Sequence, residues 1–518
     1  MSGTFDPALP SFVSLPDQIR QWAGSQGDRA ALVCEGETVS YAALDALADR
    51  CAAALQRDGV APRDVVAICA TGSIRYVAAF IGALRAGAAV APLSPTAHAD
   101  SLAGMIENAG ARLLFLDEAV ETALAAATAL PAVRAIRLDV KEGGNAFDTW
   151  LAPAGTTPQP VAIQPEWAFN IIYSSGTTGT PKGIVQSHAM RFAYAHRSTS
   201  RGYGPEAVTL TATPLYSNTT LVSFFPTLGL GGTVVLMPKF DTRHYLELAQ
   251  RHRATHTMLV PVQYRRLLAD PDFDRYDLSS FQSKSCTSAP FAADLKAEVV
   301  RRWPGTLTEF YGMTEGGASC ELRADESPGK LHTVGQPMPG HEMRLIDAEG
   351  NELPRGSIGE VVGRSPTMMT GYYRQPDKTA EAEWHDREGQ RFIRTGDIGR
   401  FDEDGFLVLM DRKKDMIISG GFNIYPSDLE QVIGAHPDVI EAAVVGVASE
   451  RWGETPVAFV TLREGAATDA PSLMAWTNER LGKMQRLAQV VVVEALPRSA
   501  IGKVLKRDLR DRFGAALA

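Results

Sequence analysis

The chain has 518 residues, which exceeds what one compact core accommodates and predicts two or more domains. Its hydrophobic content of 45% and charged content of 21% are ordinary for a soluble globular protein. The formal net charge of -9 argues against nucleic acid or an anionic membrane surface as a partner, because both favour basic proteins.

Cysteine content and the N-terminal sequence point to the compartment. The five cysteines form no Cys-x-x-Cys pair, which indicates free thiols in a reducing environment and no structural zinc. Residues 1–12 lack the basic start and apolar stretch of a secretory signal, and the apolar run 76–84 is too short to span a bilayer. We therefore expect a cytoplasmic protein without a membrane span. The sequence leaves the oligomeric state open, a homodimer included.

Helical and strand patterns alternate over the first four hundred residues, roughly. Such alternation predicts βαβ crossovers around buried parallel sheets. Between residues 342 and 373, short strands separated by Gly and Pro indicate a small antiparallel or barrel-like subdomain. The expected helices are 44–57, 75–85 and 242–253, and the expected strands are 64–70, 112–117, 233–237, 255–260, 343–346 and 360–363.

A polar loop follows the apolar run 167–172, and it reads Tyr173-Ser-Ser-Gly-Thr-Thr-Gly-Thr-Pro-Lys-Gly-Ile184. It combines five Ser/Thr hydroxyls, three glycines and one lysine. Small residues after a strand expose consecutive backbone N–H groups, the hydroxyls add donors, and Lys182 supplies a positive charge. The segment therefore predicts a phosphate-binding loop.

The P-loop and a flexible surface loop are the two alternative interpretations of this segment. The P-loop requires Gly-x4-Gly-Lys-Ser/Thr, but counting from Gly176, Pro181 stands where the second glycine belongs and Gly183 follows the lysine. A flexible surface loop is common for Gly/Ser/Thr-rich segments. The lysine after a proline at this spacing favours phosphate binding.

The residue pattern changes near residues 411–415, where an apolar segment at 406–410, expected to be a strand, is followed by a run of charged residues. A solvated turn would explain the charges alone. The pattern beyond them predicts a separate α+β unit. Its expected helices are 427–434, 472–481 and the basic 504–512, and its expected strands are 441–447, 457–462 and 490–494.

The loop from Ser174 to Lys182 resembles the signature loop of the adenylate-forming superfamily, which includes acyl- and aryl-CoA synthetases, adenylation domains of peptide synthetases and beetle luciferases. The resemblance covers the chain from about residue 30 to about residue 507. Each further motif is weak alone, but their joint order and spacing are specific to this family. They are Tyr311-Gly-Met-Thr-Glu315, Arg394-Thr-Gly-Asp397, Asp411-Arg-Lys-Lys-Asp415, Ser419-Gly-Gly-Phe-Asn-Ile-Tyr-Pro426 and Gly502-Lys503.

The resemblance implies an α/β fold with a large N-terminal domain, residues 1–411, made of two parallel-sheet α/β subdomains and a small β-barrel-like subdomain. A hinge at 412–416 and a small mobile α+β domain at 417–518 follow. It also implies a ligase that joins a carboxylic acid to coenzyme A through an acyl-adenylate, using ATP and Mg²⁺. Such an enzyme must neutralise phosphate charge, align two anions and exclude water from a mixed anhydride.

For the reaction centre, the resemblance assigns catalytic roles to Lys182, Thr314, Glu315 and Lys503. Glu315 is the candidate Mg²⁺ ligand because a hard dication favours carboxylate oxygen. Lys503 is expected to reach the site from the small domain, although composition alone describes a solvated C-terminal segment. The residues assigned to the nucleotide are Ser174, Ser175, Gly176, Thr177, Thr178, Gly179, Ser288, Ala289, Pro290, Tyr311, Gly312, Asp397 and Arg412.

For coenzyme A, Lys414 aligns with the pivot that lets the small domain serve both half-reactions. One departure from the family concerns the Lys-x-Pro-Lys/Arg element, which reads Gln485-Arg-Leu-Ala488 here. Arg486 is the candidate replacement. The residues assigned to CoA are Ser419, Gly420, Gly421, Phe422, Trp452 and Arg486.

The acyl pocket is expected at Tyr216, Ser217, Asn218, Cys286, Gly316 and Gly317. Ser217 stands where the family has a histidine, so imidazole gating is absent, and it also argues against an amino-acid substrate. The two glycines leave room for an aromatic or alicyclic ring, although they would also serve a turn. We therefore expect an aromatic, arylalkenyl or alicyclic acid, with a medium-chain fatty acid as the alternative.

Other functions remain open at this stage. An adenylating enzyme with an acceptor other than CoA would show acid-dependent pyrophosphate exchange without a thioester product. A non-catalytic relative should have lost Lys182, Glu315 or Lys503, and all three are present. A scaffold or nucleic-acid-binding protein would need a basic or repetitive surface, which the sequence does not show.

Overall fold

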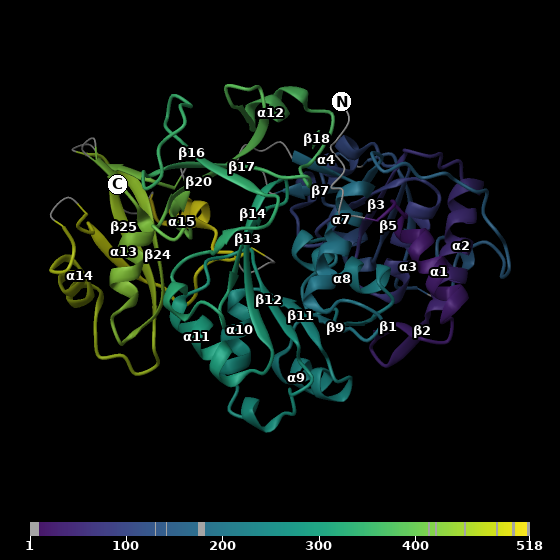
Figure 1. Cartoon of the computed structure of the whole chain (residues 1–518), viewed down its shortest axis with the longest axis horizontal. Coiled ribbons are helices and arrows are strands. Elements are labelled where there is room, and N and C mark those ends of the chain that lie inside the picture. Colours follow the sequence, from purple (N-terminus) through teal and green to yellow (C-terminus); the bar gives the residue numbers. More distant parts are fainter. Residues whose placement is uncertain are drawn as a thin grey trace. The chain divides into compact units, whose positions relative to one another are not determined.

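The computed structural model of the chain describes residues 10–129, 131–140, 142–174, 182–412, 415–419, 422–449, 452–482, 485–499 and 503–514 (Figure 1). The chain forms two compact units. The first contains the chain up to Leu331 together with Pro337–Glu342 and Gly363–Ile393, and the second contains His332–Gln336, Met343–Val362 and the chain from Arg394 onward.

The first unit contains a seven-stranded sheet of order β18-β8-β7-β4-β3-β5-β6. Its strands β7, β4, β3, β5 and β6 are parallel, whereas β8 and β18 are antiparallel to their neighbours. The strands are β3 Val65–Cys69, β4 Ala89–Pro92, β5 Leu113–Leu116, β6 Arg134–Arg137, β7 Ala168–Ser174, β8 Lys182–Ser187 and β18 Gly371–Tyr372.

A nine-stranded sheet has the order β15-β14-β13-β12-β11-β9-β10-β1-β2. The six strands from β13 to β1 are parallel, and β14 and β2 are antiparallel to their neighbours. The strands are β1 Ala30–Cys34, β2 Glu37–Ser40, β9 Val208–Thr211, β10 Thr233–Leu236, β11 His256–Leu259, β12 Ser283–Cys286, β13 Thr306–Met313, β14 Gly316–Arg323 and β15 Gln336–Pro337.

Helices cover both faces of these sheets, so the parallel strands are buried on both sides. Residues of β3 alternate between two cores: Val66 and Ile68 pack with α1, α2, α3 and α8, and Val65 and Ala67 pack with α4 and α5. The helices of this unit are α1 Leu15–Ser25, α2 Tyr41–Arg57, α3 Ile74–Arg85, α4 Ala99–Ala109, α5 Glu118–Leu124, α6 Phe147–Trp150, α7 His188–Ser198, α8 Asn218–Gly229, α9 Thr242–Arg251, α10 Pro261–Leu268, α11 Ala293–Arg302 and α12 Pro376–Glu381, with 3-10 turns at Thr199–Arg201, Phe273–Arg275 and Pro328–Lys330.

The strand β1 residue Leu32 and the β10 residues Val234 and Leu236 join the same core as Val66 and Ile68. The two large sheets therefore share the layer of α2, α3 and α8. The outer face of the nine-stranded sheet packs on α9, α10 and α11 through a second core that contains Leu210 and Val235.

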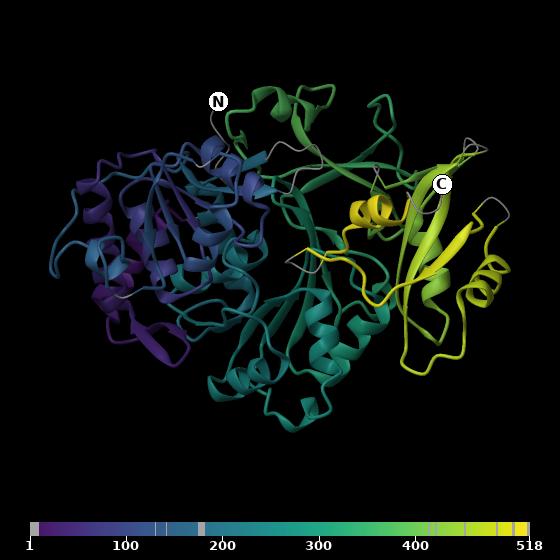
Figure 2. The same cartoon turned by 180° about the vertical axis from the view of Figure 1, so that it is seen from behind.

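The second unit contains most of a sheet of order β16-β17-β20-β19, with β21 on β20, and a sheet of order β23-β22-β25-β24, with β26 on β25. In the latter, Val444 packs with α13 and α14, while its neighbour Val445 packs with α15. Figure 2 shows α15, the last helix in yellow, and α14 on opposite sides of that sheet. The elements are β16 Glu342–Ile346, β17 Gly359–Arg364, β19 Glu383–His385, β20 Arg391–Phe401, β21 Leu407–Arg412, β22 Ile417–Ser419, β23 Phe422–Ile424, β24 Val439–Ser449, β25 Gly453–Leu462, β26 Gln489–Val492, α13 Pro426–Gly434, α14 Ala470–Asn478 and α15 Lys506–Gly514.

The sequence-based elements are confirmed, with differences at their ends. The expected helix 44–57 begins at Tyr41 because Ser40 caps it, accepting a hydrogen bond from the backbone N–H of Ala43. The expected strand 441–447 extends to Val439–Ser449, because its β25 partner continues the ladder at both ends. The five cysteines are unpaired and buried. Among the described residues, no helix combines the length and the apolar character that crossing a membrane requires.

A buried ion pair joins α11 to β13 in the first unit. Lys296 contacts the carboxylate of Glu309, and both side chains are almost completely buried. Lys296 Nζ also donates a hydrogen bond of 2.8 Å to the carbonyl of Leu331. Removing one partner would leave the other charge buried and uncompensated.

We expect Lys296→Met to lower the free energy of unfolding by about 3 kcal/mol, and the double variant Lys296→Met, Glu309→Leu to recover most of that loss. The control Lys378→Met breaks an exposed ion pair with Glu381 and should cost less than about 1 kcal/mol. Urea unfolding of the three variants measures the difference. Equal losses in the single and double variants would contradict this account.

Candidate active site

The centre of the site is the ring of Tyr372 on β18, which contacts a lysine and a carboxylate at once. Lys182 Nζ, at the start of β8, lies 5.3 Å from the ring centroid. The hydroxyl of Tyr372 donates a hydrogen bond of 2.9 Å to Glu315 Oε1. Burial and the Glu315 carboxylate raise the pKa of Tyr372, so the hydroxyl stays protonated and donates. The structure therefore brings the predicted Lys182 and Glu315 together.

The backbone around Glu315 is fixed by a tight turn between β13 and β14. The amide of Met369 donates a hydrogen bond of 2.7 Å to the carbonyl of Glu315. Gly316 has φ +85° and Gly317 has φ +59°, and a Cβ at Gly316 would lie 2.2 Å from the carbonyl oxygen of Thr367. Both glycines are thus required by the turn and by close backbone approach. Their predicted place in the acyl pocket stays a prediction.

Thr314, between β13 and β14, is held by a residue of β8, which belongs to the seven-stranded sheet. The side-chain nitrogen Nε2 of Gln186 donates a hydrogen bond of 2.8 Å to the carbonyl of Thr314, and it lies 3.5 Å from Asn218 Oδ1. Gln186 is fully buried and its Oε1 accepts a hydrogen bond of 3.1 Å from Asn170. A buried amide with partners on both sides fixes the carbonyl that precedes Glu315.

The segment after β12, predicted to border the adenine, contains strained backbone. Ser288 has φ +80°, which is costly for a residue with a Cβ. Its hydroxyl forms a hydrogen bond of 2.6 Å with the hydroxyl of Thr219 on α8. Ser217 caps α8 by accepting from the backbone N–H of Thr219. The predicted adenine segment and acyl segment are therefore joined, with Ala289 and Pro290 following Ser288 in the chain.

The other expected residues of this unit lie in β12 and β13 or in the segment between β9 and α8. Tyr311 pairs with Cys320 across β13 and β14, and a Cβ at Gly312 would lie 2.7 Å from the Ser319 hydroxyl. Burial raises the pKa of Tyr216, and its hydrogen bonds with Ser94 and Thr96 lower that pKa by less. Cys286 is fully buried at the end of β12. Its contact with an acyl group stays a prediction.

The phosphate-binding loop itself lies outside the described residues, which omit 175–181 and the side chain of Ser174. Predictions for Ser174, Ser175, Gly176, Thr177, Thr178 and Gly179 thus stay predictions. The ends of the loop are described: Ser174 and Lys182 are partners in the antiparallel β7–β8 ladder. Lys182 is therefore anchored on a strand where the loop returns to the sheet.

Asp397 and Arg412, the predicted ribose residues, lie in the second unit. They are cross-strand partners in the β20–β21 ladder. The Asp397 amide donates 3.0 Å to the Thr395 hydroxyl, and Gly396 has φ +70°. Arg394 pairs with Glu360 at 2.8 Å, which anchors β20 just before Asp397. The Arg412 side chain is outside the described residues.

Lys503 lies at the foot of a hairpin that precedes α15. Its carbonyl accepts from the backbone N–H of Ser499 at 2.8 Å, and its own amide donates 3.2 Å to the Ser499 hydroxyl. Arg498 and Val504 bridge the two arms, and Arg498 pairs with Glu441 at 2.6 Å. The hairpin therefore holds the Lys503 backbone in a defined place, although its catalytic role stays a prediction.

The described residues among those predicted to bind coenzyme A lie at one end of the β23-β22-β25-β24 sheet. Ser419 pairs with Phe422 and with Gly453, which follows the exposed Trp452. Arg486 is exposed and lies two residues before Ala488. The backbone N–H of Ala488 donates a hydrogen bond of 2.9 Å to the carbonyl of Pro456, at the same end of β25. Lys414, Gly420, Gly421 and the Phe422 side chain are outside the described residues.

Comparisons with known proteins identify the family. A family described as AMP-binding enzyme matches residues 19–373, and the AMP-binding enzyme C-terminal domain matches residues 428–503. The chain is 33% identical over 493 residues to the fatty acid–[acyl-carrier-protein] ligase ScoC of Streptomyces coeruleorubidus, covering 93% of each chain. It is 32% identical over 512 residues to the indoleacetate–CoA ligase of Aromatoleum aromaticum, covering 96% of this chain and 98% of the relative.

The crystal structure of ATP-bound MatB from Rhodopseudomonas palustris superimposes on this chain with a TM-score of 0.86 and is 30% identical to it. The superposition covers 98% of this chain and 100% of MatB. The chain thus belongs to the AMP-binding enzyme family, the adenylate-forming enzymes predicted from its motifs. It is an AMP-forming acid–thiol ligase that uses ATP and Mg²⁺.

Glu315 offers a carboxylate oxygen to a metal ion that also binds the nucleotide, since Mg²⁺ commonly combines one or two carboxylates with phosphate oxygens and water. No cluster of three or more His, Cys, Asp or Glu side chains suited to a metal occurs among the residues that the structure describes. Within the described chain Lys182 and Glu315 form no ion pair with each other: Lys182 faces the Tyr372 ring and Glu315 accepts from the Tyr372 hydroxyl.

Sequence reasoning missed Tyr372 and Gln186, two residues that hold predicted site residues in place. Tyr372 lies far along the chain from Lys182 and Glu315, and it reaches them because β18 pairs with β8 with Tyr372 opposite Ile184. Gln186 could have been noticed as an uncharged polar residue within the apolar pattern of β8.

We expect Tyr372→Phe to lower the adenylation rate by about tenfold at limiting Mg²⁺ and by less at saturating Mg²⁺. The ring that Lys182 faces is kept, but the Glu315 carboxylate loses the hydrogen bond that orients it. Tyr373→Phe, at the adjacent position, is the matched control and should behave as the wild type. Acid-dependent pyrophosphate exchange across a Mg²⁺ titration measures the effect, and a loss independent of Mg²⁺ would contradict the role given to Tyr372.

Proposed function

We propose that the protein is a carboxylic acid–CoA ligase acting through an acyl-adenylate, with an aromatic, arylalkenyl or alicyclic acid as substrate. The observation that carries the proposal is the placement of Lys182 and Glu315 on one tyrosine ring beside the ends of the phosphate loop. A cation and a separate carboxylate suit a triphosphate and its metal ion, respectively.

The chemistry proceeds in two displacements. A carboxylate oxygen of the acid attacks the α-phosphorus of ATP, the bond to the bridging oxygen breaks, and pyrophosphate leaves. The CoA thiol then loses its proton and attacks the acyl carbon, and AMP leaves with the electrons of the anhydride bond. Mg²⁺ held at Glu315 supplies charge neutralisation on the phosphates when it is bound.

This chain's residues bind and orient the reactants in that sequence. Lys182 offsets negative charge on the phosphates, and Thr314 donates a hydroxyl to the α-phosphate. Lys503 bridges the acid carboxylate and the α-phosphate during adenylation. A rotation about the hinge at Lys414 then exchanges Lys503 for the CoA segment that contains Ser419 and Trp452.

Two features support an aromatic acid. The indoleacetate–CoA ligase that resembles this chain is named for an aromatic acid. In this chain, Ser217 provides a small capping hydroxyl at the start of α8, so no imidazole narrows that position. A fatty acid is the second candidate, because ScoC is named for a fatty acid and an acyl-carrier-protein acceptor.

A panel of acids tests the substrate class and the acceptor together. We expect AMP release with aromatic acids such as indoleacetate or a cinnamate to exceed that with octanoate by about tenfold or more, since a complementary apolar pocket discriminates by a few kcal/mol at most. AMP release should require free CoA and should yield the thioester. Activity on octanoate alone, or only with a carrier protein as acceptor, would contradict the proposal.

The role of Lys503 is tested by separating the half-reactions. We expect Lys503→Ala to reduce acyl-adenylate formation by about a thousandfold, because one charge-stabilising group at the α-phosphate is lost. CoA attack on chemically prepared acyl-adenylate should stay within about threefold of the wild type. Arg507→Ala, an exposed cation nearby on α15, is the control. Equal losses in both half-reactions would show that Lys503 does not act in adenylation.

A further inference from the structure

Arg191, a buried arginine of α7, packs against β7 and α8. The side chain of Arg191 is buried, and its terminal nitrogens Nη1 and Nη2 have no hydrogen-bond partner within the described chain. Burial lowers the pKa of Arg191 to about 10, so the guanidinium stays charged at neutral pH. No described carboxylate pairs with the Arg191 guanidinium.

The guanidinium borders a small cavity. Its walls are formed by Val13, Leu15, Gln18, Phe169, His188, Arg191, Phe192, Ala195 and Phe225. The cavity is small, with room for about one water-sized particle. His188 Nδ1 is a second buried nitrogen on this wall without a partner among the described residues. Burial lowers the pKa of His188 to about 3, so its imidazole is neutral and can carry its proton on Nδ1.

The surroundings of the guanidinium do not balance its charge. The Arg191 guanidinium carbon lies 5.8 Å from the ring centroids of both Phe169 and Phe225. Cation–π contacts of this kind recover less than the desolvation of a buried ion costs. A neutral water could accept from the two free nitrogens but would leave the charge uncompensated, whereas a monoatomic anion satisfies both requirements.

We propose that this cavity binds a single chloride ion, held by Nη1 and Nη2 of Arg191 and by the Nδ1–H of His188. The apolar walls exclude a hydrated or polyatomic anion on grounds of size. Nothing in the assigned reaction uses this position, and the site is separate from the residues expected to bind ATP, the acid or CoA.

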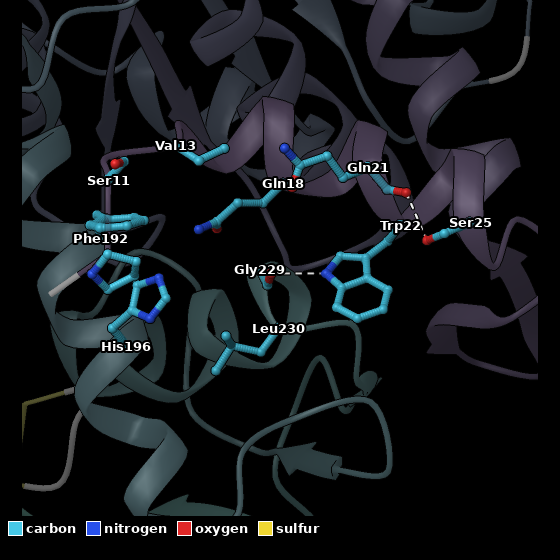
Figure 3. A pocket seen from close by; sticks show the side chains of 11 residues that line it. Ser11, Val13, Gln18, Gln21, Trp22, Ser25, Phe192, His196, Gly229 and Leu230 are labelled. Atoms are coloured by element: carbon cyan, nitrogen blue, oxygen red, sulfur yellow. Dashed lines mark hydrogen bonds between the residues drawn. The ribbon is translucent and has the colours of Figure 1, made fainter.

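A route from solvent is present. The cavity shares Val13, Gln18 and Phe192 with a larger pocket of about 390 Å³, drawn in Figure 3. Figure 3 shows the Gln18 side chain reaching toward Phe192 and His196 from α1, with Trp22 farther along the same helix. Ser11, Gln21 and Ser25 on the rim of the larger pocket are exposed, so the pocket opens to solvent.

The ion would also affect the reaction centre through one chain of buried hydrogen bonds. Arg191 Nε donates 2.9 Å to Asn170 Oδ1, and Asn170 donates to Gln186, which donates to the carbonyl of Thr314. An anion that fixes the guanidinium therefore stiffens the segment that carries Thr314 and Glu315. We expect adenylation to be faster with chloride present, by about fivefold.

The full-length protein is compared in sodium chloride and sodium gluconate at equal ionic strength. Chloride should raise the wild-type Tm by about 2 °C or more with saturation, because an anion that binds only the folded state stabilises it. Arg191→Met should lose this chloride dependence, while Arg251→Met, an exposed arginine on α9, should keep it. Crystals grown in bromide should show an anomalous peak within hydrogen-bonding distance of both terminal nitrogens of Arg191.

The proposal is overturned if the wild-type Tm is independent of chloride, or if the bromide crystals show a water or a carboxylate of the chain in the cavity. If Arg191→Met does not fold, the wild-type titration and the anomalous map still decide the matter. These two measurements do not depend on enzymatic activity, so a failure of the proposed ligase reaction is distinguishable from a failure of the anion site.

Discussion

The site depends on one aromatic ring that keeps opposite charges apart while holding both. Tyr372 presents its face to the Lys182 ammonium and its hydroxyl to the Glu315 carboxylate. Had the lysine and the carboxylate met directly, each would have satisfied the other and neither would offer its charge to a ligand. The tyrosine orients both without neutralising either. This arrangement suits a reaction in which a polyanion and its counter-cation must be bound together.

The positions of these three side chains follow from the edge of the seven-stranded sheet. Lys182 begins β8 where the phosphate loop returns, and Tyr372 comes from β18, the antiparallel strand added beside β8. Glu315 comes from another sheet and is brought in by the turn after β13, where Gly316 and Gly317 allow close backbone approach. Two sheets thus contribute to one centre, and the shared helical layer between them fixes their separation.

The sequence predicted the local elements and the ends of the site, but not the contacts that join them. Alternating patterns located strands such as β3 and helices such as α9, because burial on a sheet or a helix leaves a periodic trace. Lys182 was identified from the composition of its loop, and Glu315 by resemblance. Tyr372 was missed because its role arises from strand pairing, which a single sequence does not encode in any short pattern. Gln186 was overlooked although a polar residue within a buried strand is itself a signal.

The left-handed backbone of Ser288 affects the stability of the protein. A side chain at φ +80° stores conformational free energy that the surrounding packing must offset, and glycine would adopt the same conformation without that burden. Yet the serine hydroxyl is what ties the loop to Thr219 on α8. A glycine at residue 288 would therefore relieve the backbone but release the loop from α8.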